Sequence, residues 1–285
     1  MTNSFRFGFI ADCQLGCAAG FSGMTTRQRA ELERTEGLKV QPLAPITGFD
    51  WDLAQLERAI AYLNDLDVEF VVVGGDMIDD ATDEAQYAAM RQAFARLRSP
   101  VMWVAGNHDV ADDGVTPTPD SLQRYRDRHG DDLVAFDHGG ATFLSIDTVV
   151  LDQADSLPDE LRHQVAWLDD QLARAAQSPG PLIVFGHHPL FVDHPDEPDS
   201  YWNLPSDIRR QLIERFSAAG VSAYFCGHLH RNESPVGVDF EMVASAAVGF
   251  PLGNDPSGLR IVEVSNEALR HRYVTLDDLD KGVRP

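Results

Sequence analysis

Apolar and polar positions follow a regular order over the first third of the chain. Aromatic residues at every second position predict a strand over residues 5–11. Leucine and isoleucine then recur three or four residues apart, which predicts a helix beginning near Trp51. Residues 69–73 and 101–104 are short apolar runs typical of buried strands, and a second helix is predicted between them over residues 83–97. This alternation of strands and helices is typical of an α/β fold.

The second half of the chain is predicted to contain more strand. Residues 133–136 and 141–146 flank Gly139-Gly140 and read as a hairpin. Further strands are predicted over residues 182–185, 223–226, 240–245, 259–264 and 270–275. Two more helices are expected, one with an apolar stripe from Leu161 to Leu172 and one over residues 208–216.

Residues 15–50 show no clear period and are expected to form an irregular insertion. Such a segment is longer than most loops in a compact domain, and long loops are usually functional or mobile. The same holds, more weakly, for residues 110–120 and 194–205. Because no repeat, low-complexity tract or linker interrupts the pattern, residues 1–285 are expected to form a single domain.

Polar side chains follow five of the predicted strands. In chain order, the blocks are Asp12-Cys13-Gln14, Gly74-Gly75-Asp76-Met77-Ile78-Asp79, Gly106-Asn107-His108-Asp109, Gly186-His187-His188-Pro189 and Gly227-His228-Leu229-His230. Each block alone could be a turn, a helix cap or a surface pair. Together they indicate a site, because ligands bind beyond the carboxyl ends of strands in open α/β sheets. Four blocks begin with glycine, which allows a sharp turn and close approach to a ligand.

The order and spacing of these blocks resemble the motifs of the calcineurin-like metallophosphoesterase superfamily from Asp12 to His230. The resemblance implies an α/β (α+β) fold, a four-layer α/β/β/α sandwich of two mixed sheets flanked by helices. It also implies metal-dependent hydrolysis of phosphoesters. Segments outside the motifs, such as residues 201–204, 242–249 and 252–260, resemble members described as serine/threonine-protein phosphatases. The resemblance is weakest over residues 15–50.

The same resemblance implies a site for two divalent metal ions. One ion would be held by Asp12, Gln14, Asp76 and His230, and the other by Asp76, Asn107, His187 and His228. Gln14 stands where histidine is commoner, so one ion would be surrounded mainly by oxygen, which favours Mn²⁺ or Mg²⁺. The predicted metals are manganese or an iron–manganese pair, with magnesium or zinc as alternatives. His188 matches no ligand position and is expected to pack or to line the rim.

The implied mechanism uses a hydroxide that bridges the two ions and attacks phosphorus, because bound cations lower the pKa of water toward neutrality. His108 is assigned to neither metal and is predicted to protonate the leaving oxygen, with Asp79 or Asp109 orienting its ring. Substrate contacts are predicted for Arg231, Tyr201 and Trp202. A surface ion pair for the arginine and core packing for the two aromatic residues are the alternatives.

Charge and composition narrow the choice of partners. The 285 residues carry a formal net charge of −22, which argues against binding to nucleic acid or to anionic membrane surfaces. Two divalent ions would still make the site locally positive. No apolar stretch approaches the roughly 20 residues needed to cross a bilayer. With no predicted secretory signal, and with three cysteines that form no disulfide framework, the expected location is the cytoplasm.

The expected substrate is a phosphopeptide or a small phosphoester, and the favoured reaction is phosphomonoester hydrolysis. The alternatives are a phosphodiesterase or a nucleotide pyrophosphatase, acting on cyclic nucleotides or ADP-ribose, because the same metals serve both mono- and diesters. A non-catalytic metal-binding module is a further alternative, although no predicted ligand is missing. The sequence predicts no oligomeric state.

Overall fold

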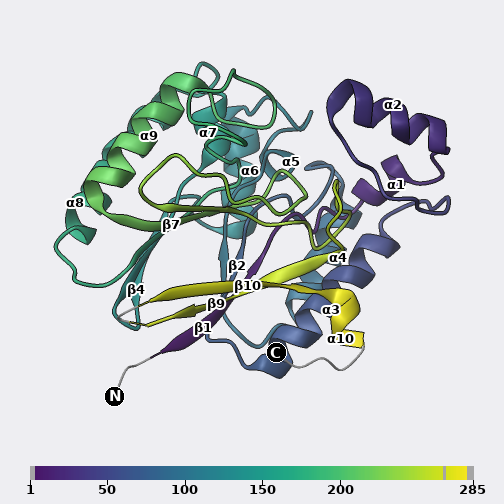
Figure 1. The fold of residues 1–285 in the computed structure, drawn as a ribbon, viewed down its shortest axis with the longest axis horizontal. Helices are drawn as coiled ribbons and strands as arrows, with labels where there is room; N and C mark the ends of the chain where they lie inside the picture. Colours follow the sequence, from purple (N-terminus) through teal and green to yellow (C-terminus); the bar gives the residue numbers. More distant parts are fainter. Residues whose placement is uncertain (1–3, 266–267, 281–285) are drawn as a thin grey trace.

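The computed structural model describes residues 4–265 and 268–280, which form two five-stranded sheets that face one another (Figure 1). The first sheet contains, in order, β10 (Leu269–Thr275), β9 (Gly258–Val264), β1 (Phe5–Ile10), β2 (Val71–Val73) and β3 (Val101–Trp103). The second contains β4 (Val134–His138), β5 (Ala141–Ser145), β6 (Leu182–Phe185), β7 (Val221–Cys226) and β8 (Glu241–Ala244). Both sheets are mixed: β1–β2–β3 and β5–β6–β7–β8 pair in parallel, and the other strands pair antiparallel.

An aromatic core joins the two sheets. Phe7 of β1 lies edge-on to Phe143 of β5 and to Phe185 of β6, with ring centroids 5.7 and 5.9 Å apart. Phe9 stacks on Phe185 at 5.9 Å. These side chains are fully buried, and burying each is worth about 1.5–3 kcal/mol. The alternation of phenylalanine along β1 therefore places this row of aromatic rings between the sheets.

Helices cover the outer faces of both sheets. On the first sheet, α3 (Asp50–Leu66), α4 (Glu84–Phe94) and α10 (Leu276–Asp280) share one apolar cluster with Val71 and Val73. On the second sheet, α8 (Pro158–Ala175) and α9 (Ser206–Ala219) pack in the same way. The predicted four-layer α/β/β/α sandwich is confirmed.

The prediction of irregular structure over residues 15–50 was wrong. This segment contains α1 (Cys17–Phe21) and α2 (Thr26–Glu36), and it ends at the start of α3. Thr25 and Gln28 form a capping box at the start of α2, and Gly37 ends the helix with a φ of 71°. No residue of α2 is buried, so the helix has no apolar stripe by which its period could be recognised. The capping box stabilises its start, and Leu32 alone packs partly buried against the neighbouring apolar cluster.

The other helices are short or polar and were also missing from the prediction. They are α5 (Asn107–Val110), α6 (Pro119–His129), α7 (Thr148–Asp152) and the C-terminal helix α10. Because α5 and α7 begin shortly after β3 and β5 end, they carry residues toward the site. Predicted strands at residues 69–73 and 101–104 are shorter in the structure, at three residues each.

Residues 17–46, here called the cap, stand out from the sandwich beside the strand ends (Figure 1). The cap has an apolar cluster of its own, in which Leu38 and Val40 pack with Phe250 and Leu252 of the main body. Phe21 stacks on Phe250 with centroids 5.7 Å apart. This cluster fixes the cap against the main body.

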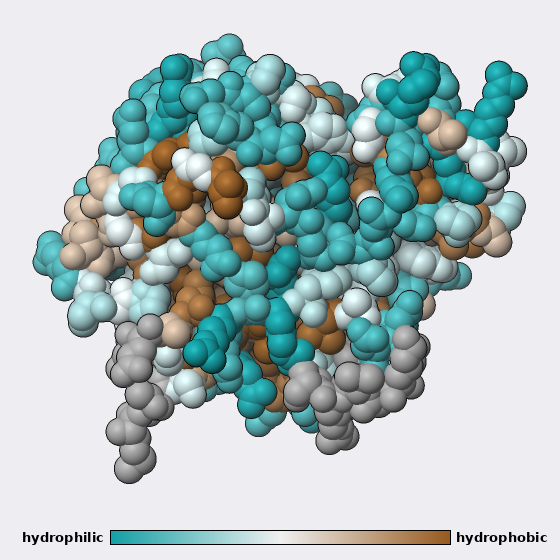
Figure 2. All heavy atoms as spheres, in the orientation of Figure 1, coloured by the Kyte–Doolittle hydropathy of each residue, from teal (hydrophilic) through white to brown (hydrophobic). Residues whose placement is uncertain are grey.

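Hydrophilic side chains cover α2 and much of the face seen in Figure 2. Large apolar side chains that are exposed in the described part of the chain are Val115, Tyr201 and Val236. Within residues 4–265 and 268–280, no helix has the length and apolar character needed to cross a membrane.

Candidate metal centre

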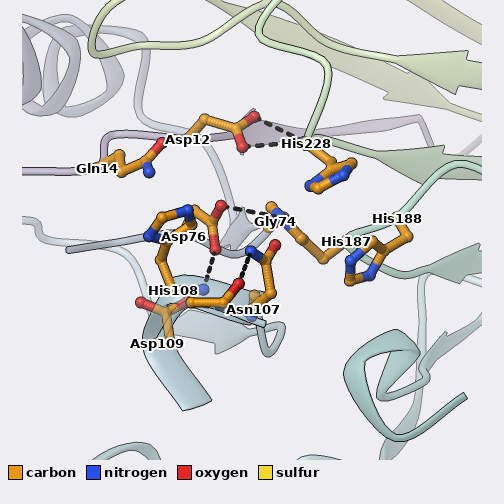
Figure 3. A network of polar contacts seen from close by, with 12 residues as sticks. Asp12, Gln14, Gly74, Asp76, Asn107, His108, Asp109, His187, His188 and His228 are labelled. Carbon is orange, nitrogen blue, oxygen red and sulfur yellow. Dashed lines mark hydrogen bonds and ion pairs between the residues drawn. The ribbon is translucent and has the colours of Figure 1, made fainter. Parts of the chain in front are cut away.

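The five polar blocks meet at one end of the sandwich, where β1, β2, β3, β6 and β7 end. Asp12, Asp76 and His230 bring one potential ligand atom each to within 4.8 Å of one another, and so do Asp76, His187 and His228. All five residues are buried, and Asp76 belongs to both groups. Figure 3 shows Asp12 and Gln14 facing Asp76, with Asn107 and His108 on its other side. One end of the fold therefore holds two overlapping sets of metal-ligating atoms.

Each of the three histidines has one ring nitrogen occupied by a backbone carbonyl. Nδ1 of His187 donates to Gly74 O at 2.9 Å, and Nδ1 of His230 donates to Phe250 O at 2.7 Å. In His228 the donor is Nε2, which reaches Tyr201 O at 2.8 Å. A hydrogen bond of this kind fixes the tautomer and leaves the other nitrogen free to bind a metal. In His187 that nitrogen lies 3.1 Å from Asp76 Oδ2.

The two amide side chains are oriented in the same way. Gln14 Nε2 donates to Asp79 Oδ1 at 3.0 Å, and Asn107 Nδ2 donates to Gly114 O at 2.6 Å. The oxygen of each amide is buried and has no hydrogen-bond partner. Buried polar atoms are almost always satisfied, so such orphaned oxygens require an explanation. Divalent cations at the two groups would provide it, and the residues present therefore fit a pair of metal ions.

The charges of the clustered side chains also favour bound metal ions. Burial raises the pKa of Asp12 above its usual range. Burial acts similarly on Asp76, but the attraction of His187 outweighs it and holds that pKa low. His187 is buried too, yet Asp76 raises its pKa to about 9, whereas burial lowers that of His228 to about 3. Two buried carboxylates are costly as anions unless cations compensate them.

The backbone beneath the cluster is held in an unusual conformation. Among the described residues, the non-glycine positions with positive φ are Asp12, Gln14, Asp67, Asp76, His228 and His230. All but Asp67 belong to the predicted metal ligands. Such φ values are uncommon for residues with a Cβ. The backbone strain that they imply is found mainly at functional sites. Glycine is required nearby: a Cβ on Gly75 would lie 2.4 Å from His187 Nδ1, and one on Gly227 would lie 2.5 Å from Asp12 Oδ2.

His108 lies beside the cluster, on α5. Its backbone N–H donates to Asp76 Oδ1 at 2.9 Å, and its ring Nδ1 donates to Asp79 O at 2.8 Å. Burial lowers the pKa of His108, but the carboxylate of Asp76 and the hydrogen bond to Asp79 raise it more, so the net shift is upward. The imidazole is part of neither metal-ligating group. It lines the open cleft above them.

Asp79 and Asp109 act differently from the prediction that a carboxylate orients His108. Asp79 holds the ring through its backbone carbonyl, and its carboxylate instead fixes Gln14, while lying 3.8 Å from His108 Nδ1. Asp109 does not reach the ring: it accepts from the backbone N–H groups of Met77 at 2.8 Å and of Gly106 at 3.1 Å. Asp109 therefore braces the loop that carries Asp76.

A cleft of about 560 Å³ opens above the cluster, and the cap forms one of its walls. Tyr201 and Trp202, which the sequence predicts as substrate contacts, both line it. Trp202 also packs against the apolar cluster of the cap. Arg231 does not line the cleft; it pairs with Glu233 at 3.0 Å. This placement argues against the substrate contact predicted for Arg231.

Further contacts support the cluster: Thr148 was not found from the sequence, and Tyr201 and His188 have contacts there that the sequence did not predict. Thr148 Oγ1 accepts from the backbone N–H groups of His187 and His188, at 3.1 and 3.0 Å. Tyr201 contacts two predicted ligands, because its hydroxyl accepts from Asn107 Nδ2 at 3.4 Å and its carbonyl accepts from His228. His188 is buried and packs against His228, with ring centroids 4.4 Å apart. No sequence motif marks Thr148 or the residues whose backbone carbonyls bind the histidine rings.

A four-layer α/β/β/α sandwich with two metal-ligating groups that share a carboxylate is the arrangement of a metal-dependent phosphoester hydrolase. The chain belongs to the calcineurin-like phosphoesterase family, whose model matches residues 5–232. It is a hydrolase of that family, and the family fold implies a dinuclear centre of divalent metal ions.

Two similar relatives are both named serine/threonine-protein phosphatase CPPED1. The Homo sapiens protein is 36% identical over 249 residues, which cover 83% of this chain and 78% of that protein. The Danio rerio protein is 35% identical over 245 residues, or 82% of this chain and 78% of the relative. A solved structure of a dimetal phosphatase from Danio rerio has a TM-score of 0.65 at 15% identity, with 95% of this chain and 99% of that chain covered. That structure shares the fold.

Proposed function

We propose that this protein is a phosphomonoesterase that acts as a protein serine/threonine phosphatase. The observation that carries the proposal is the pair of metal-ligating groups sharing Asp76 at the floor of an open cleft. The relatives named serine/threonine-protein phosphatase support the choice of substrate class. The cleft, of about 560 Å³, is lined by Asp76, His228 and His230, so it gives access to the predicted metal centre.

The metal ligands follow from the two groups and the orphaned amide oxygens. Asp12, Gln14, Asp76 and His230 would hold one ion, and Asp76, Asn107, His187 and His228 the other. Because the first ion has a single nitrogen ligand, manganese, magnesium or iron suits it better than a soft metal. When bound, the two ions supply positive charge for the phosphate oxygens and an activated water as nucleophile.

The protein's own groups position the substrate and move the leaving proton. The two carboxylates bring two negative charges against four positive ones on the ions, so the site attracts phosphate despite the net charge of −22. His108 faces the cleft with its Nδ1 held by Asp79 O, which leaves Nε2 to donate a proton to the leaving alkoxide. Tyr201 and Trp202 form a wall against which the leaving group rests.

Metal removal tests the proposal directly. Chelation should abolish hydrolysis of p-nitrophenyl phosphate and lower the melting temperature, because the buried carboxylates lose their counter-charge. Addition of Mn²⁺ should restore both. Turnover of a phosphoserine peptide above that of bis(p-nitrophenyl) phosphate, cyclic AMP and ADP-ribose would support a monoesterase. Faster turnover of the diesters would contradict the proposal, and so would full activity after chelation.

The contact between Asp79 and Gln14 gives a second test. Asp79→Ala should leave the Gln14 amide free to rotate and weaken one metal site by ~10–100-fold, the usual effect of losing a residue that orients a ligand. Asp79→Asn keeps an oxygen that can accept from Gln14 Nε2 and should bind both metals nearly as well. Calorimetric titration with Mn²⁺ measures the difference. Equal affinity in the alanine and asparagine variants would show that this contact does not orient the ligand.

A further inference from the structure

The wall that the cap contributes to the cleft carries one charged side chain. The cap residues that line the cleft are Cys17, Gly20, Phe21, Glu36 and Leu38, and Trp202 and Leu252 lie on the main body. Among the described residues that line the cleft, none is lysine or arginine. Beyond the predicted metal ligands, the cleft therefore offers apolar surface and two carboxylates: that of Asp79, which accepts from Gln14 and lies beside the metal centre, and that of Glu36 on the cap.

No described residue neutralises Glu36. It is exposed, and its side chain makes neither a hydrogen bond nor an ion pair with any residue in the described part of the chain. The cations close to it in sequence are engaged elsewhere: Arg34 pairs with Glu31, and Lys39 bonds to Asn254. Glu36 is also the last residue of α2, so the negative end of the helix dipole adds to its charge.

We propose that Glu36 selects phosphomonoesters whose leaving group carries a cationic group, such as an ammonium or a guanidinium. The inference rests on the proposed phosphomonoesterase function. The metal ions attract the phosphate, and Glu36 attracts a positive charge farther out on the same substrate, across the apolar surface formed by Phe21, Leu38 and Trp202. A leaving group with further negative charge is repelled. Among phosphopeptides, those with lysine or arginine beside the phosphorylated residue fit this arrangement.

Matched substrates test the assignment in the metal-loaded enzyme. Phosphoserine peptides that differ only in arginine or glutamate beside the phosphoserine form one arm. Phosphoethanolamine and glycerol phosphate form the other, which separates peptide from small-molecule substrates. The wild type should prefer the cationic member of at least one pair. Glu36→Gln should reduce that preference by about 2- to 5-fold, through KM, as expected for an exposed charge pair. Glu36→Arg should reverse it, and high salt should weaken it in the wild type.

The controls separate the inference from the proposed function. Glu33→Gln, a change of the same charge on the same helix at a residue that does not line the cleft, should leave the preference intact. p-Nitrophenyl phosphate, which carries no cation, should be hydrolysed equally by all variants. A wild type that prefers neither cationic substrate, or a preference that Glu36→Gln leaves unchanged, overturns the inference alone. Failure of the metal-loaded wild type to hydrolyse any monoester overturns the proposed function and the inference with it.

Discussion

Replacing Asp76 by asparagine is expected to remove both metal ions and nearly all activity. Asp76 is the residue shared by the two metal-ligating groups, so its loss takes one anionic ligand from each. The metals are expected to supply several kcal/mol of transition-state stabilisation, which corresponds to a fall in kcat of at least ~10³-fold. Metal content by elemental analysis and turnover of p-nitrophenyl phosphate measure the two effects.

Two matched variants make this result interpretable. Asp12→Asn removes a carboxylate that belongs to one group only, and should weaken one metal site while the other still fills. Asp120→Asn makes the same change at an exposed position on α6 and should alter neither metal content nor turnover. If Asp76→Asn retained both ions, Asp76 could not be the bridging ligand.

His108→Gln is expected to keep both metals and lose ~10²–10⁴-fold in the hydrolysis of an alkyl phosphate, the usual contribution of a general acid. The imidazole is in neither metal-ligating group, and the bond from the His108 backbone to Asp76 survives the substitution. The loss should be much smaller with p-nitrophenyl phosphate, whose leaving group departs without a proton. Comparison of the two esters in the same metal-loaded variant measures this difference.

The dependence on leaving group is what distinguishes a proton donor from a structural histidine. An equal loss on both esters would mean that His108 acts through the metal site or the fold, and no loss would exclude it from the reaction. His194→Gln changes an exposed histidine outside the cleft and should leave the kinetics of both esters unchanged.

The fold and the positions of the ligand blocks could be predicted because they depend on features with a strong local signature. The alternating phenylalanines of β1 and the apolar runs of β2 and β6 are buried, and these patterns are visible in the sequence. Polar blocks that follow such strands must lie at one edge of a sheet. The sequence therefore predicts that the motif residues lie together.

The sequence did not predict two kinds of feature: the contacts made by backbone groups, and the helix that lies on the polar surface. The carbonyls of Gly74, Tyr201 and Phe250 fix the three histidine rings, and a carbonyl has no residue type by which to recognise it. The helix α2 buries no residue, so its period is invisible. The sequence also did not predict that Asp109 accepts from the backbone N–H groups of Met77 and Gly106 instead of contacting the His108 ring. Which of these groups Asp109 reaches depends on the conformation of the loop, and residue type does not determine that conformation.

The left-handed backbone at Asp12, Gln14, Asp76, His228 and His230 has a consequence for how this protein can change. Glycine relieves such conformations, so these positions are where the scaffold could be stabilised most easily by a single substitution, at the loss of a predicted metal ligand. Stability and activity are thus opposed at the same residues. A lineage released from selection for catalysis would be expected to drift first at these positions and to keep the sandwich as a sturdier, metal-free module.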